Sequence, residues 1–135
     1  MRQIPWRYGE LPVLLQKSLL LLEQGRIGKA RTTLREVQTL ARELQHQSFL
    51  FASRILEAKL QAAAGERQAA MGALQHLLAE ANTPDQQAET LYEMWKVSGD
   101  PAWAERALAA LIERYAATPR AIYQKRIDEL RAAPA

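Results

Sequence analysis

Apolar residues recur along most of the chain at intervals of three and four positions, which places them on one face of an α-helix. In residues 26–45 the apolar positions with this spacing are Ala30, Leu34, Val37, Ala41 and Leu44. Seven segments of this kind are separated by residues that end or begin helices, and each predicts one helix. The predicted helices span residues 13–24, 26–45, 47–64, 66–81, 84–97, 101–117 and 119–133.

The residues between these segments support the predicted boundaries. Gly25 is expected to end the first helix, because glycine accepts the left-handed backbone conformation that often follows a helix. Three dipeptides combine a residue that caps a helix N-terminus with a proline suited to the first helical position. They are Thr83-Pro84, Asp100-Pro101 and Thr118-Pro119. The helices are therefore joined by short turns, and consecutive helices should run antiparallel.

The composition agrees with an all-α fold. Of the 135 residues, 24 are Ala and 20 are Leu, while Ile and Val together number only 9. Ala and Leu favour helices, whereas β-branched residues favour strands. The absence of cysteine excludes a disulfide scaffold, a cysteine zinc site and a cysteine nucleophile. No apolar run could cross a bilayer and the N-terminus lacks the apolar stretch of a secretory signal, so we expect a cytoplasmic protein with no membrane segment.

A glycine followed by three apolar positions occurs three times. Gly25, Gly65 and Gly99 lie 40 and 34 residues apart, and each is followed by apolar residues five, nine and twelve positions later. These residues are Ala30, Leu34 and Val37, then Ala70, Leu74 and Leu77, then Ala104, Leu108 and Leu111. The alanine lets two helices approach closely, and the larger residues fill the groove of a neighbouring unit. The repeat predicts an α-solenoid of antiparallel helix pairs.

These segments resemble tetratricopeptide repeats, in which a turn glycine is followed by an alanine and then by aromatic or aliphatic residues on the second helix of each pair. On the first helices Ser18 and Ala58 match the small residue that the family prefers, and Tyr92 departs from it. The resemblance implies one domain with three repeats and a capping helix. The implied boundaries are 1–9 for an N-terminal extension, 10–45, 46–82 and 83–117 for the repeats, and 118–135 for the cap. The Leu- and Ala-rich texture is also similar to repeat regions of large bacterial signalling and regulatory proteins.

The curvature of such repeats implies a concave groove lined by the first helix of each pair. The residues expected to contact a partner there are Leu15, Leu19, Ile55, Lys59, Glu89, Glu93 and Lys96. This groove would be apolar at one end and charged at the other, which suits an amphipathic helix or an extended peptide. The resemblance therefore implies a protein-binding scaffold. A ligand-sensing regulatory module and a nucleic-acid-binding protein are the alternatives.

The first predicted helix has leucines all around its circumference, and such a helix must be covered on all sides. We therefore expect self-association, as a homodimer, or packing within a longer repeat array. The leucines expected to take part are Leu14, Leu20, Leu21 and Leu22. The alternative is that residues 4–8 fold back over the helix.

The polar residues do not form a pattern typical of an active site. His46 and His76 are the only histidines, and neither has the neighbours of a metal or nucleophile-base site. Glu89 and Glu93 share a helix face, but acid–base catalysis also needs a pocket that shifts one pKa. We expect no enzymatic activity, no catalytic residue, no metal site and no cofactor.

The net charge of +3 raises the question of nucleic-acid binding. Two predicted helices carry arginine stripes, namely Arg31, Arg35 and Arg42, and Arg120, Arg126 and Arg131. Acidic residues interrupt both stripes, at Glu36, Glu43, Asp128 and Glu129. This pattern is typical of solvent-facing helix surfaces and argues against nucleic-acid binding.

Overall fold

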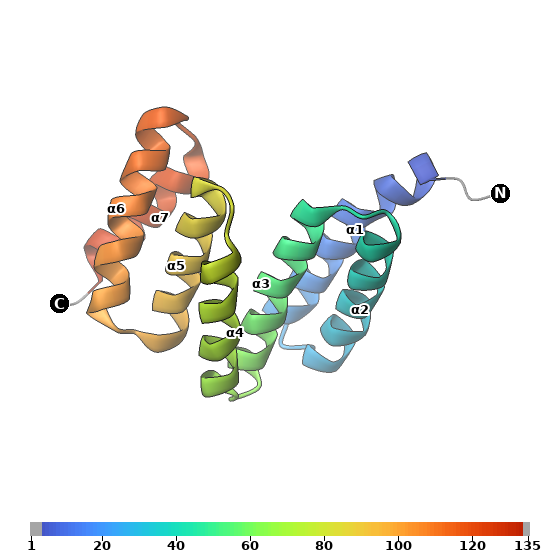
Figure 1. The fold of residues 1–135 in the computed structure, drawn as a ribbon. Helices are drawn as coiled ribbons and strands as arrows, with labels where there is room; N and C mark the ends of the chain where they lie inside the picture. The colour runs from blue at the N-terminus through green and yellow to red at the C-terminus, as the bar shows by residue number, and fades with distance from the viewer. Residues whose placement is uncertain (1–3, 134–135) are drawn as a thin grey trace. The chain divides into compact units, whose positions relative to one another are not determined.

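The computed structural model describes the backbone of residues 4–133 and the side chains of residues 9–133. Within this range the chain forms seven α-helices and no strand (Figure 1). They are α1 (Ile4–Glu23), α2 (Ile27–Glu43), α3 (Gln47–Ala63), α4 (Arg67–Glu80), α5 (Pro84–Ser98), α6 (Pro101–Ala117) and α7 (Ala121–Ala132). Consecutive helices pack in pairs, as in a helical-repeat chain, so the predicted all-α fold class is confirmed.

The contacts between residues divide the chain into two compact units. The first unit extends to Ala70 and the second begins at Met71, so the boundary falls inside α4. The first unit contains α1, α2 and α3, and the second contains α5, α6 and α7. Each unit has its own buried apolar clusters, and the two are described separately below.

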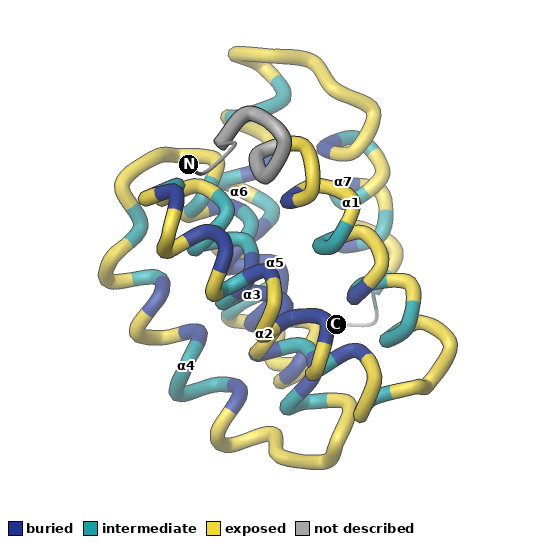
Figure 2. Tube along the Cα trace, turned by 90° about the vertical axis from the view of Figure 1, so that its right-hand side faces the viewer, coloured by how far each residue is buried: buried dark blue, intermediate teal, exposed yellow. Residues whose placement is uncertain are grey.

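In the first unit, α1 packs against both α2 and α3, and α2 packs against α3. Two clusters of buried apolar side chains join these helices. One consists of Leu11, Val37, Leu40, Ala41 and Leu44, and the other of Ala30, Leu34, Leu56 and Leu60. Buried and exposed residues alternate along the helices (Figure 2), as the periodicity predicts. Burial of each large aliphatic side chain contributes roughly 1.5–3 kcal/mol to the stability of such a unit.

In the second unit, α6 packs against α5 on one side and α7 on the other. One cluster of buried side chains connects the three helices. Its members are Ala88, Leu91, Tyr92, Ala107, Leu111, Tyr123, Ile127 and Leu130. Leu78 from α4 and the half-buried Trp95 and Trp103 pack against this cluster.

Three turns in the first unit share one backbone geometry. Gly25, Gln45 and Gly65 have positive φ angles of 77°, 55° and 87°. Each donates its N–H to the carbonyl three residues before it, and the next residue donates to the carbonyl five before it, at 2.8–3.1 Å. This hydrogen-bond pattern satisfies the last carbonyls of a helix. The helix end predicted at Gly25 is confirmed, whereas the same conformation at Gln45 was not anticipated, because glutamine rarely adopts it.

Two of the three predicted capping dipeptides begin helices. The side chain of Thr83 accepts a hydrogen bond from the Gln86 N–H at 3.1 Å, and that of Asp100 accepts one from the Ala102 N–H at 2.9 Å. The third prediction is wrong. Thr118 is the C-terminal cap of α6, and α7 begins only at Ala121 after Arg120, whose side chain makes no capping hydrogen bond.

The first helix begins earlier than predicted. Pro12 lies inside α1, which starts at Ile4 and includes residues 4–9 of the predicted N-terminal extension. Proline removes one backbone hydrogen bond and costs a helix about 3 kcal/mol. Leu11, beside it, is fully buried against α2, and tertiary packing of this kind can offset a local preference.

Candidate functional site

The inner face of α1 is packed tightly in the first unit. Leu11 and Ser18 are both fully buried, and the Ser18 hydroxyl donates a hydrogen bond to the Ala30 carbonyl at 2.8 Å. The leucines that flank Leu11 and Ser18 on the surface of α1 are half-buried against the two apolar clusters. They are Leu14, Leu15, Leu19, Leu21 and Leu22.

The opposite face of α1 is exposed. Val13 is 66% exposed and Leu20 is 53% exposed, and Lys17, between them in sequence, is also exposed. Positions 13, 17 and 20 lie on one face because their spacing is four and three. We call these three residues the outer stripe of α1. In the described residues it contains the two most exposed large apolar side chains.

This arrangement refines the prediction about the leucines of the first helix. Leu20 is the one that faces solvent, whereas Leu14, Leu21 and Leu22 already contribute to the packing of their own unit. Val13 also belongs to the exposed face, although only leucines were predicted to take part in this contact. The backbone of residues 4–8 continues α1 as helix and does not fold back over it, so that alternative is wrong. The side chains of residues 4–8 lie outside the described range.

A cleft of about 260 Å³ lies between α2 and α3 in the first unit. Its lining residues are Arg31, Leu34, Arg35, Gln38, Glu57, Leu60, Gln61 and Glu66. Two weak polar contacts cross it: Arg31 lies 3.7 Å from Glu66, and the Gln38 amide donates to Glu57 at 3.4 Å. The Gln61 Oε1 atom is buried and accepts no hydrogen bond. An acceptor of this kind favours a bound N–H or O–H group.

A second cleft, of about 340 Å³, lies between α1 and α2. Its lining residues are Glu10, Leu14, Arg35, Glu36, Thr39 and Leu40. Arg35 lines both clefts, and its guanidinium makes no ion pair within residues 9–133. From the sequence alone, Arg35 was predicted only to be part of a charged, solvent-facing helix surface.

In the second unit, Glu129 of α7 connects that helix to α5. One carboxylate oxygen accepts a hydrogen bond from the Tyr92 hydroxyl at 2.5 Å, and the other lies 2.9 Å from the Lys96 ammonium. Burial by itself would raise the pKa of Glu129, but these two hydrogen bonds and the charges of Lys96 and Arg126 leave the pKa below its ordinary value. Burial and the hydrogen bond to Glu129 raise the pKa of Tyr92 well above its usual 10.0.

Asp85 at the start of α5 is held in a similar way. It accepts a hydrogen bond from Tyr123 at 2.5 Å and another from the Arg114 guanidinium at 3.0 Å. The Tyr123 hydrogen bond is the main reason why the pKa of Asp85 is lowered, with the charge of Arg114 adding to it against the effect of burial. Asp85 also lies in the first turn of its helix, where the helix dipole favours a negative charge. Asp85 thus ties the start of α5 to α6 and α7.

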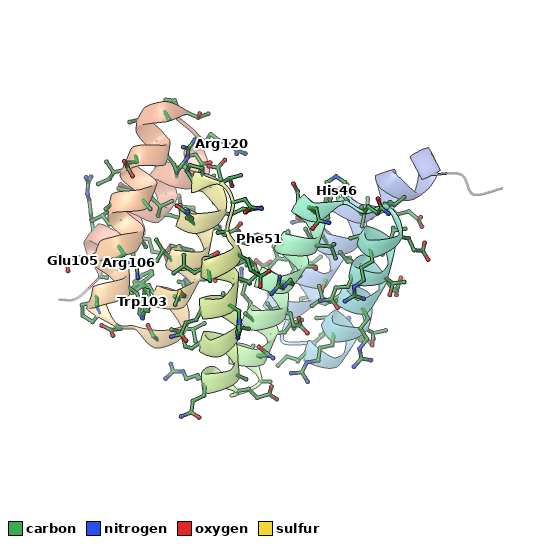
Figure 3. All side chains as sticks on the ribbon, viewed as in Figure 1. His46, Phe51, Trp103, Glu105, Arg106 and Arg120 are labelled. Atoms are coloured by element: carbon green, nitrogen blue, oxygen red, sulfur yellow. The ribbon has the colours of Figure 1, made fainter. Side chains whose placement is uncertain are left out.

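Arginines of the second unit are engaged with neighbouring side chains. The Arg126 guanidinium lies 4.5 Å from the centre of the Tyr92 ring and 3.9 Å from Glu89. Arg120, labelled in Figure 3, lies 5.6 Å from the centre of the Tyr123 ring. Contacts of this kind hold two of the six arginines considered for nucleic-acid binding against the protein itself.

The residues predicted to line a groove fall in both units. Leu15, Leu19, Ile55 and Lys59 belong to the first unit, and Glu89, Glu93 and Lys96 to the second. Leu15 and Leu19 come together against one cluster, Lys59 is half-buried, and Glu89 and Lys96 each pair with α7. Ile55 and Glu93 are only 4% and 3% exposed, so they offer almost no surface to a partner. Glu129 and Arg126 were not predicted as partners of α5, because no local sequence pattern connects them to that helix.

The two histidines have no common role. His46 at the start of α3 (Figure 3) is its N-terminal cap: its Nδ1 atom accepts the Phe49 N–H at 3.3 Å. Its ring also packs edge-on against the Phe49 ring, with centroids 4.7 Å apart. His76 is exposed on α4. Within the described residues, His, Asp and Glu side chains form no group of three that could hold a metal, and no helix is long and apolar enough to span a membrane.

Comparison of the chain with protein-family models, curated proteins and solved structures finds no match. The resemblance to tetratricopeptide repeats thus rests on the glycine, alanine and leucine positions of the sequence itself.

Proposed function

We propose that this protein is a protein-interaction module whose outer stripe on α1 binds a helix of a partner. The observation that carries the proposal is the exposure of Val13 and Leu20 on a helix whose other side is already packed. A helix of a globular protein normally keeps its outward face polar. Two large apolar side chains in register, two turns apart, instead favour contact with a further helix.

The resemblance to tetratricopeptide repeats supports the same class of function, because such repeats form binding surfaces for peptides and helices. The Leu- and Ala-rich texture, similar to repeat regions of bacterial signalling and regulatory proteins, extends the proposal to a cytoplasmic regulatory assembly. Within such an assembly the chain acts as a scaffold that carries no catalytic group of its own.

The proposal is tested by retention of partner proteins on the immobilised chain and on two single variants. Leu20→Asp places a charge on the outer stripe, and Ile112→Asp places the same charge on another exposed apolar residue, 41% exposed on α6. We expect proteins from native lysate that bind the wild type and Ile112→Asp but not Leu20→Asp, as identified by mass spectrometry. Identical retention by all three chains, or retention no greater than on the bare support, contradicts the proposal.

A second candidate function is ligand sensing, and the α2–α3 cleft specifically favours it. The buried Gln61 Oε1 atom is an open acceptor, and Arg31 and Arg35 supply positive charge beside it. A small ligand that carries an N–H group and an anionic group would satisfy both. We expect such a ligand to raise the unfolding temperature of the wild type but not of Gln61→Leu. A screen of amino acids and nucleotides that leaves the wild-type temperature unchanged argues against this function.

A further inference from the structure

The outer stripe of α1 can be compared with the equivalent positions of α3, because both helices end in turns of the same geometry. Gly25 and Gly65 lie 40 residues apart and have the same positive-φ conformation and the same pair of hydrogen bonds. Each position on α1 therefore corresponds to the position 40 residues later on α3. The outer stripe corresponds to Ser53, Glu57 and Leu60.

On α3, the apolar position equivalent to Leu20 is covered by α2. Leu60 is only 1% exposed and lies in one cluster with Ala30 and Leu34 of α2. Ser53, the equivalent of Val13, is fully buried. Leu20 and Val13 thus occupy positions that are buried on α3.

The polar position of the outer stripe indicates which charge a helix docked on α1 should carry. On α3 this position is Glu57, and its carboxylate accepts a hydrogen bond from Gln38 of α2 at 3.4 Å. On α1 it is Lys17, which is exposed and makes no ion pair within residues 9–133. Consider a helix that packs on α1 as α2 packs on α3. Its residue at the position of Gln38 would lie opposite the Lys17 ammonium group. A carboxylate is the complementary group there.

We propose that the outer stripe of α1 docks an amphipathic helix from another protein, packed as α2 packs on α3, with a carboxylate facing Lys17. This inference rests on the proposed function and specifies the chemistry of the partner. This packing requires that the docked helix carry alanine, leucine and an acidic residue at intervals of four residues. These three residues take the places of Ala30, Leu34 and Gln38 of α2.

A second copy of this chain fits the stripe less well. Four helices of the chain carry alanine and leucine at this interval, in six series, and the next residue of each series is Gln38, Leu60, Leu78, Ala81, Ile112 or Tyr115. None of these is acidic. A symmetric antiparallel pairing of two outer stripes would bring Lys17 of each copy close together, and like charges at such a contact oppose association.

The test uses a fluorescent synthetic peptide with the α2 sequence, residues 27–43, and Gln38→Glu, and a matched peptide with Gln38→Lys. A short helix is marginal in water, so both peptides are stapled through positions 32 and 36, which are exposed on α2. Fluorescence anisotropy with the full chain measures binding. We expect the glutamate peptide to bind about fivefold more tightly than the lysine peptide, the magnitude of a partly exposed charge pair.

Variants of the full chain complete the test. Lys17→Glu should reverse the preference between the two peptides, and Leu20→Asp should abolish binding of both while circular dichroism shows an unchanged helical fold. Ile112→Asp is the control and should bind as the wild type does. Equal affinity for both peptides, no binding at millimolar concentration, or binding that survives Leu20→Asp overturns the inference.

Sedimentation velocity tests whether a second copy of this chain, and not another protein, covers the outer stripe. A wild-type chain that dimerises while Leu20→Asp stays monomeric would show that a second copy covers the stripe, which overturns the assignment to another protein. The peptides could fail to bind while partner proteins are still retained by the wild type and lost by Leu20→Asp. This result would overturn the inference of an amphipathic helix with a carboxylate facing Lys17, and the proposed function would still stand.

Discussion

The Tyr92 hydroxyl of α5 donates a hydrogen bond to Glu129 of α7 at 2.5 Å, across 37 residues of sequence. Between these two helices in the chain lies α6, which packs against both. The hydrogen bond therefore connects the first and last helices of a three-helix arrangement. Lys96, one turn after Tyr92, binds the other oxygen of the same carboxylate, so a single side chain of α7 is held by two residues of α5.

Replacing Tyr92 with phenylalanine should lower the free energy of unfolding by about 1 kcal/mol. The substitution keeps the aromatic ring and removes only the hydroxyl that donates to a charged group, one-third of which is exposed to solvent. Urea unfolding followed by circular dichroism measures the change. Tyr115→Phe is the matched control, because this half-buried tyrosine packs against the same cluster without a hydroxyl hydrogen bond to a described residue. A loss equal to that of the control would contradict the prediction.

The stability of the second unit should fall in acid. The folded pKa values of Asp85 and Glu129 lie below the ordinary values of 3.8 and 4.5, so both groups stabilise the fold fully at pH values above these. As the pH falls past 4.5 and 3.8 toward the folded pKa values, this contribution is progressively lost. Urea unfolding between pH 7 and pH 2.5 measures the effect. The Asp85→Asn and Glu129→Gln double variant should lose less stability over this range than the wild type, and equal losses would argue against the assignment.

The stabilising contribution of Tyr92 should be lost at alkaline pH, whereas those of Asp85 and Glu129 are lost in acid. Its folded pKa is raised above the ordinary 10.0, so its contribution to stability is complete below pH 10 and is lost as the pH rises past that value. Unfolding of the wild type and of Tyr92→Phe at pH 9 and pH 11 measures this loss. A phenylalanine variant with the same alkaline dependence as the wild type would contradict the prediction.

Gln45→Gly should stabilise the protein by about 0.5–1 kcal/mol. Gln45 has a φ of 55°, a region in which an L-residue with a side chain is strained and glycine is not. Part of the gain is offset because glycine adds freedom to the unfolded chain. Thermal unfolding measures the change. Gly25→Ala is the reciprocal test: space for the added methyl group is open, so the expected loss of about 1 kcal/mol comes from the backbone alone.

Pro12→Ala should increase both the helix content and the stability of the first unit. The substitution restores a backbone N–H inside α1 and removes the steric conflict that a proline ring generally causes in a helix interior. We expect a gain of about 1–3 kcal/mol, observed by urea unfolding and by slower amide exchange of residues near position 12. Pro84→Ala is the control, since Pro84 occupies the first turn of α5, where proline is tolerated and the gain should be absent.

The sequence by itself determined the features that depend on neighbours in the chain. Periodic apolar positions define seven helices, Gly25 adopts the left-handed conformation after the first, and Thr83 and Asp100 cap two others. These features follow from hydrogen bonds and steric limits that act over three to five residues. Where local rules conflicted with packing, as at Pro12 inside α1, the local prediction was wrong.

Only the tertiary structure decided which side chains face solvent and which distant residues meet. Leu20 and Leu22 are equivalent in the sequence, but one is exposed and the other packs against a cluster, because α2 and α3 cover one side of α1. The pairs Tyr92–Glu129 and Asp85–Tyr123 join residues 37 and 38 positions apart. Such contacts have no local pattern, because they depend on the angle at which whole helices pack and not on the residues beside them.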